Sequence, residues 1–214
     1  MEYQNRATLS QLFFKEGVTR IGSYAAGVPA SNEAPNGSVS AVWLPSTLIG
    51  IGNYAFSNQS KLRSVHLPAG ATDLGKHIFA GSGLTVIIDL DVENALALPA
   101  GMAVIPEGFA CQCAGLYKVS LPGSIREIGP SVFAYCVGLG ELAFAGSAPT
   151  IAVNAFTYDR LTASYYSALP GWDTAIKSQY GARSITWLPL ESITLTLPAW
   201  QYAVAHGLKT EPLP

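Results

Sequence analysis

The chain has 214 residues, 12% of them charged and 49% hydrophobic, with a formal net charge of −2. This balance, and the lack of any lysine or arginine run, argue against a nucleic-acid partner. No apolar run reaches the ~20 residues that span a membrane. Residues 1–10 do not resemble a secretory signal, so we expect an exported form to carry its leader outside this sequence.

A repeated phrase follows a short lead-in over residues 1–12. In its clearest copy it reads Ile-Gly-Asn-Tyr-Ala-Phe, at residues 51–56, and it recurs after about 23 or 30 residues. A weaker first copy has Ala26 where the later copies carry phenylalanine. The phenylalanines are Phe56, Phe79, Phe109, Phe133 and Phe156. A period of this size predicts a solenoid of about six coils, because one coil alone cannot bury its apolar face.

Each unit also contains a short apolar segment that ends in Leu-Pro. The proline stands eleven residues before the phenylalanine at Pro45, Pro68 and Pro122, whereas the copy at residues 98–99 requires one deleted residue before Phe109. The residues before the proline alternate between apolar and polar, which is typical of a half-buried strand. Proline ends the strand because it cannot donate to a ladder. We expect the phenylalanine rings to stack from coil to coil.

Two insertions interrupt the repeat. Residues 27–38 have the composition of a loop, whereas residues 84–97 include a stretch of strand composition that we expect to widen the sheet. In this stretch Asp89, Asp91 and Glu93 alternate with apolar residues and so share one strand face. They form either a solvated face, a calcium site or, least of all, a catalytic carboxylate pair.

Three cysteines follow, and an odd number does not define a disulfide framework. Cys113 and Cys136 stand at equivalent positions of neighbouring coils and are expected to be stacked neighbours, with Cys111 close by. They are buried free thiols, a coil-to-coil disulfide or part of a metal site. Zinc requires a fourth ligand at suitable spacing, and the sequence shows none. We therefore predict no cofactor.

Beyond the last phenylalanine the period fails. Residues 157–189 are predicted to cap the last coil, because an open end would expose an apolar face and an unpaired sheet edge. The expected cap consists of two short helical pieces between residues 162 and 180 and a closing strand at 185–188. Residues 190–214 are a tail or the beginning of a further module.

These features resemble the BspA-type leucine-rich repeats of bacteria, whose units read Leu-x-x-Val-x-Leu-Pro, then Ile-Gly-x-x-Ala-Phe-x-x-Cys. The resemblance covers about residues 13–156. It implies a leucine-rich-repeat solenoid, mainly β with short turns and helical pieces, and a terminal Tyr…Gly-Trp cap. It favours free thiols, since the family commonly carries cysteine in that column. It also implies a cell-surface or secreted location, Bacteroidetes-like bacteria as the source, and a role in adhesion.

The outward residues of the Leu-Pro strands form the best candidate surface. They fall into two columns, and an exposed tryptophan beside a histidine suits a binding face. In the competing interpretation the loop at residues 27–38 covers the tryptophan. The candidate ligand-binding residues are Trp43, His66, Tyr117, Lys118, Ser120 and Glu141.

The predicted function is non-catalytic recognition of a host or bacterial protein, or of a glycan, through this face and the inserted loops. No triad, phosphate loop or dinucleotide fingerprint indicates an enzyme. Two alternatives stay open. One is a structural spacer within a larger surface protein, and the other is a calcium-dependent module at Asp89, Asp91 and Glu93.

Overall fold

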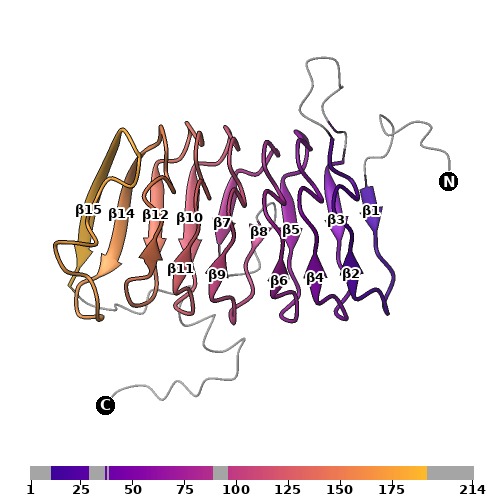
Figure 1. Ribbon diagram of the computed structural model, residues 1–214, viewed down its shortest axis with the longest axis horizontal. Coiled ribbons are helices and arrows are strands. Elements are labelled where there is room, and N and C mark those ends of the chain that lie inside the picture. Colours follow the sequence, from indigo (N-terminus) through magenta and orange to yellow (C-terminus); the bar gives the residue numbers. More distant parts are fainter. Residues whose placement is uncertain (1–10, 29–36, 38, 89–95, 192–214) are drawn as a thin grey trace, which may run out of the picture.

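A computed structural model describes residues 11–28, 37, 39–88 and 96–191, which form a β-solenoid (Figure 1). Its largest sheet has nine strands, all paired in parallel. In spatial order they are β1 (Gln11–Phe13), β3 (Ala41–Trp43), β5 (Ser64–His66), β8 (Leu96–Ala97), β7 (Val86–Ile88), β10 (Lys118–Leu121), β12 (Glu141–Phe144), β14 (Arg160–Tyr166) and β15 (Ser184–Leu190).

Two three-stranded sheets lie on a second side of the coils, and each of their strands belongs to one coil. The first contains β2 (Arg20–Ile21), β4 (Gly50–Ile51) and β6 (Asp73–Leu74); the second contains β9 (Val104–Ile105), β11 (Glu127–Ile128) and β13 (Thr150–Ile151). These strands correspond to the Ile-Gly step of the repeat. Glycine is needed after β6 because a Cβ on Gly75 would lie 2.6 Å from the amide nitrogen of Asn53 in the coil before. The six predicted coils are confirmed.

The second insertion widens the large sheet, as predicted. β7 lies between β8 and β10, and so adds a strand that no other coil contributes (Figure 1). At the same level the described strands of the second side divide into two separate sheets. The division falls between β6 and β9. Asp89, Asp91 and Glu93 lie outside the described residues.

Backbone hydrogen bonds between coils define which residues are equivalent. In each of the first five coils the amide of one residue donates to the carbonyl just before its equivalent in the next coil, over 2.8–3.0 Å. We call this residue the ring position. The six ring positions are Ala26, Phe56, Phe79, Ala110, Phe133 and Phe156.

The prediction that Phe109 holds the ring position of the fourth coil, after a deletion, is wrong. The amide of Ala110 donates to the carbonyl of Val132, and the amide of Phe79 donates to the carbonyl of Phe109. Phe109 therefore comes one residue early. Leu98 lies twelve residues before Ala110, the spacing found in the other coils, so no residue is missing.

The five phenylalanine rings are completely buried. Phe56 stacks on Phe79, with ring centroids 5.8 Å apart, and Phe133 stacks on Phe156 at 6.0 Å. Phe109 meets Phe79 edge-on at 5.3 Å. Although both residues are described, no ring contact joins Phe109 to Phe133. The predicted ladder is confirmed in two parts and interrupted at the fourth coil, where the ring is displaced from its column.

The predicted helical pieces after residue 160 are wrong, and the described part of the chain contains no helix. β14 pairs with β12 along the large sheet, and its Leu161, Ala163 and Tyr165 alternate as buried residues with more exposed ones. This period of two is that of a strand. The closing strand predicted at 185–188 is confirmed within β15, the last strand of the sheet, where Pro189 is tolerated because no described strand pairs with its outer side.

Aromatic residues cover both ends of the core. At the first coil, where Ala26 leaves space at the ring position, Phe14 meets Phe56 edge-on at 6.4 Å. At the other end Trp172 packs on Phe144 at 4.9 Å and donates from Nε1 to the carbonyl of Gly146. At the last ring position itself, Tyr180 meets Phe156 edge-on at 6.4 Å. These aromatic side chains shield the two ends of the core from water.

Candidate binding face

The outward side chains of the large sheet form the two predicted columns. In the second half of the sheet, Ser120 pairs in register with Ala143 and Ser164. The neighbouring column holds Lys118 and Glu141. Both columns follow from parallel pairing without slippage, which keeps every second side chain on the solvent face.

Two aromatic rings stand at the beginning of the face. Phe13 and Trp43 are register neighbours on β1 and β3, and their rings stack at 4.3 Å with an interplanar angle of 9°. Phe13 is 67% exposed and Trp43 is 45% exposed. His66 follows on β5 and is exposed as well. The rings stack along the column, so they present their edges to solvent.

A hollow of about 650 Å³ lies in the other half of the face. Its floor consists of small side chains at Ser120, Ala143 and Ser164, and Leu188 of β15 forms part of its lining. Three small residues in succession leave this space in the same column that carries Phe13 and Trp43 at its beginning. The face therefore has an aromatic part and a hollow, hydroxyl-lined part.

An ion pair borders the hollow. Lys118 Nζ lies 3.2 Å from Glu141 Oε2, and both side chains are largely exposed. A pair of this kind contributes little to stability, about 0.2–1 kcal/mol, and neutralises its own charge. Tyr117 just before β10 is exposed, and its carbonyl accepts the amides of Gly140 and Glu141. The hollow therefore offers hydrogen-bonding groups without a net charge.

The structure gathers only some of the predicted site residues. Lys118, Ser120 and Glu141 line the hollow, with Tyr117 at its margin, whereas Trp43 and His66 lie on β3 and β5. Four strand spacings separate β3 from β10, or about 19 Å. The prediction missed Phe13, Thr162, Ser164 and Leu188. Phe13 was detectable, since it stands one residue before the end of its segment as Trp43 does, and Thr162 and Ser164 were lost to the helical interpretation.

A second row of aromatic residues follows the turns that flank the ring positions. Tyr24 stacks on Tyr54 at 5.0 Å, and Tyr54 stacks on His77 at 4.8 Å. All three have a positive φ of 56–57°, a left-handed conformation that is rare for bulky residues. The equivalent residue of the fourth coil is Gly108, which also has a positive φ.

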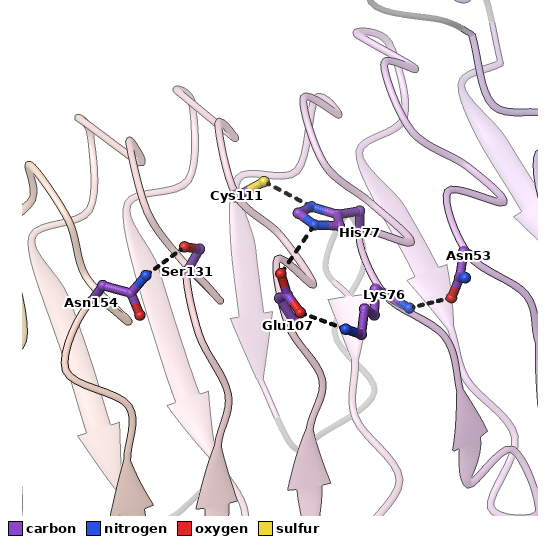
Figure 2. A network of polar contacts seen from close by, with 7 residues as sticks. All are labelled: Asn53, Lys76, His77, Glu107, Cys111, Ser131 and Asn154. Carbon is purple, nitrogen blue, oxygen red and sulfur yellow. Dashed lines mark hydrogen bonds and ion pairs between the residues drawn. The ribbon is translucent and has the colours of Figure 1, made fainter.

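Polar side chains link neighbouring coils along these turns (Figure 2). Lys76 Nζ lies 2.7 Å from Glu107 Oε2, and this hydrogen bond lowers the pKa of Glu107 and raises that of Lys76. His77 lies between Glu107 and Cys111. Farther along, Asn154 donates to the hydroxyl of Ser131 at 3.1 Å.

All three cysteines are free thiols, so the disulfide reading is wrong. Cys113 donates to the carbonyl of Phe79, and Cys136 to that of Ala110, each one coil back. Burial raises the pKa of Cys113 to about 12 and that of Cys136 well above its usual range. These two thiols are neutral side-chain donors that tie the coils together.

The cysteine column consists of the third residue after the ring position in the second to sixth coils. On either side of the two cysteines, the column holds other buried polar residues. Its members are Gln59, Ser82, Cys113, Cys136 and Asp159. Both carboxyl oxygens of Asp159 are buried, and neither accepts a hydrogen bond from another described residue. Burial raises the pKa of Asp159 to about 8, so it is neutral near pH 7.

Within residues 11–28, 37, 39–88 and 96–191, no three histidine, cysteine or acidic side chains converge in a way that could hold a metal ion. Among the same residues, no helix is long and apolar enough to cross a bilayer.

The comparison with solved structures matched bacterial leucine-rich repeat proteins. One from Eubacterium ventriosum is 16% identical, matches 88% of this chain and 46% of its own, and gives a TM-score of 0.48. One from Bacteroides ovatus is 18% identical, matches 85% of this chain and 51% of its own, and gives a TM-score of 0.45. A leucine rich cell surface protein from Faecalibacterium prausnitzii is 16% identical, matches 90% of this chain and 62% of its own, and gives a TM-score of 0.37. This chain thus spans less than two thirds of their lengths.

No curated protein matches the chain. The family model for the BspA type leucine rich repeat region matches six copies across residues 34–162, more than half of the sequence. The matched residues include the ring positions of the second to sixth coils. The chain belongs to the BspA type leucine-rich repeat family.

Proposed function

We propose that this protein is a non-catalytic recognition module at the bacterial cell surface or in the secreted space, which binds a protein or a glycan through its strand face. The observation that carries the proposal is the stacked, exposed pair of Phe13 and Trp43 on that face. Large aromatic rings held in one orientation are the usual anchors of binding surfaces, because little conformational entropy is lost on contact.

The hollow over β10, β12 and β14 supports the same function. Its hydroxyl groups at Ser120, Thr162 and Ser164 can donate and accept hydrogen bonds. Its one ion pair is internally compensated. A neutral, hydrogen-bonding partner suits this part of the face better than a strongly charged one.

The test is binding of the purified protein to an oligosaccharide array and to an array of host extracellular proteins. We expect at least one ligand, whose affinity falls in Trp43→Ala and in Ser164→Trp, which fills the hollow. Val153→Ala is the matched control, since Val153 is 84% exposed and lies away from the strand face. Equal losses in all three variants would contradict the strand face as the site. No binding on either array would favour the spacer function.

A further inference from the structure

A thiol, an imidazole and a carboxylate lie in line where the third and fourth coils meet. The Sγ of Cys111 is 3.5 Å from His77 Nδ1, and His77 Nε2 is 4.0 Å from Glu107 Oε1. Figure 2 shows Cys111 and Glu107 on opposite sides of the imidazole ring. Nucleophile, base and orienting group follow one another in this order at activated thiols.

The imidazole is held in place on both of its faces. Its ring stacks on Tyr54 with an interplanar angle of 6°. On the other side lies Gly108, where an added Cβ would be 2.0 Å from His77 Nδ1. Because the fourth coil has glycine there, the ring can lie over its backbone and reach Cys111. Glu107, the second partner of the ring, is itself held by Lys76.

Cys111 differs from the other two cysteines. Cys113 and Cys136 are completely buried, and each donates to a backbone carbonyl. Cys111 is partly exposed, and the equivalent residues of the two neighbouring coils are Ala80 and Ala134, whose side chains are small. Of the three cysteines, Cys111 is therefore the one that is not fully enclosed by the core.

We propose that Cys111 is a site of thiol–disulfide exchange with a low-molecular-weight disulfide, and that His77 accepts the proton of its thiol. Sγ attacks one sulfur of the reagent, the disulfide bond of the reagent breaks, and a mixed disulfide forms on Cys111. The released thiolate leaves, and the proton on His77 passes to that thiolate or, when the leaving thiol is acidic, to solvent. One disulfide is exchanged for another, so no further oxidant is needed.

A base is required because the thiol does not ionise readily. Burial raises the pKa of Cys111 to about 11, so the sulfur is protonated at neutral pH. The other titratable groups near this array are Lys76 and Glu107, the phenol of Tyr54, and the thiols of Cys113 and Cys136. Within the described residues, His77 is the titratable group whose ring nitrogen lies within hydrogen-bonding distance of the sulfur, at 3.5 Å, which makes it the proton acceptor.

The test is the reaction of the native protein with 5,5′-dithiobis(2-nitrobenzoate), followed by release of the coloured thiol across pH 5.5–10. We expect one of the three thiols to react in the folded protein and all three in denaturant. Cys111→Ser abolishes the native reaction, and mass spectrometry places the adduct on Cys111 in the unmodified sequence.

His77→Tyr is the informative variant, because tyrosine occupies the equivalent position in two other coils and keeps the stack on Tyr54. We expect the rate at pH 7.5 to fall at least about tenfold. The rate of the variant should rise with pH until the thiol itself ionises, and the wild-type rate should exceed it most near neutral pH. His77→Gln replaces it if the tyrosine variant does not fold. An unchanged rate and pH profile, or a native protein whose three thiols are all inert, would overturn the proposal.

Discussion

The fourth and fifth coils share one backbone arrangement and differ in how they fill it. In the fifth coil Phe133 stands at the ring position and stacks on Phe156. In the fourth coil Ala110 stands there, and Phe109, one residue earlier, turns its ring edge-on toward Phe79. Both rings are completely buried. Hydrogen bonds between coils therefore set the register, and the side chains fill the core around that register.

The largest expected effect concerns the regular coil. Phe133→Ala should lower the free energy of unfolding by about 3–5 kcal/mol, because it removes a buried ring and leaves a cavity against Phe156. Equilibrium denaturation in urea measures this. A loss below about 1 kcal/mol would mean that the stacked rings do not hold the coils together.

Restoring phenylalanine at the ring position of the fourth coil should not help on its own. Ala110 is completely buried, so Ala110→Phe overpacks the core and should cost about 1–3 kcal/mol. Adding Phe109→Ala to the same chain conserves the core volume and should recover part of that loss. If Ala110→Phe alone stabilised the protein in thermal melts, the assignment of Ala110 to the ring position would be wrong.

Asp159, the last member of the cysteine column, should make the free energy of unfolding depend on pH. Asp159 ionises above its ordinary pKa of 3.8 when unfolded but only above about 8 when folded. Between these values the unfolded chain binds fewer protons, so stability falls as the pH rises, by up to about 1.4 kcal/mol per pH unit. Urea melts from pH 5 to pH 8 measure this slope. Asp159→Ser introduces the residue that the third coil has at the equivalent position, Ser82, and should reduce the pH dependence of the free energy of unfolding. An unchanged pH dependence would mean that another group causes it.

At the residue with positive φ in the turn before the ring position, the fourth coil should tolerate an added side chain less well than the fifth coil does. Gly108→Ala places a methyl group against the His77 ring and a side chain at positive φ, so we expect a loss of about 1–2 kcal/mol. Ser131→Ala is the matched control, because Ser131 already has a side chain at φ 53°. Equal melting temperatures for the two variants would show that the His77 ring is free to move.

The smallest expected change in the free energy of unfolding concerns an exposed aromatic ring. Trp43→Ala should change the free energy of unfolding by less than about 0.5–1 kcal/mol, since Trp43 is 45% exposed and its ring stacks on the exposed Phe13. A loss comparable to that of Phe133→Ala would make Trp43 a core residue and remove the proposed anchor.

Much of the fold was predictable because each copy of the sequence repeat forms one coil of the solenoid. The spacing of twelve residues from Leu98 to Ala110 also indicated the correct register, but the nearby phenylalanine outweighed it in the interpretation. β14 was mistaken for helix although its buried residues alternate. The order of β7 and β8 was not predictable, since strand composition does not say where an added strand enters a sheet. The hollow depends on residues from three coils and on β15, which no local pattern connects.

The register of the fourth coil is the central claim, and couplings across hydrogen bonds test it most directly. In a deuterated, isotope-labelled sample, long-range NMR correlations should join the amide nitrogen of Ala110 to the carbonyl carbon of Val132, and that of Gln112 to the carbonyl carbon of Ala134. A correlation from the amide of Phe109 to the carbonyl of Val132 would contradict the account, because it would place phenylalanine at the ring position.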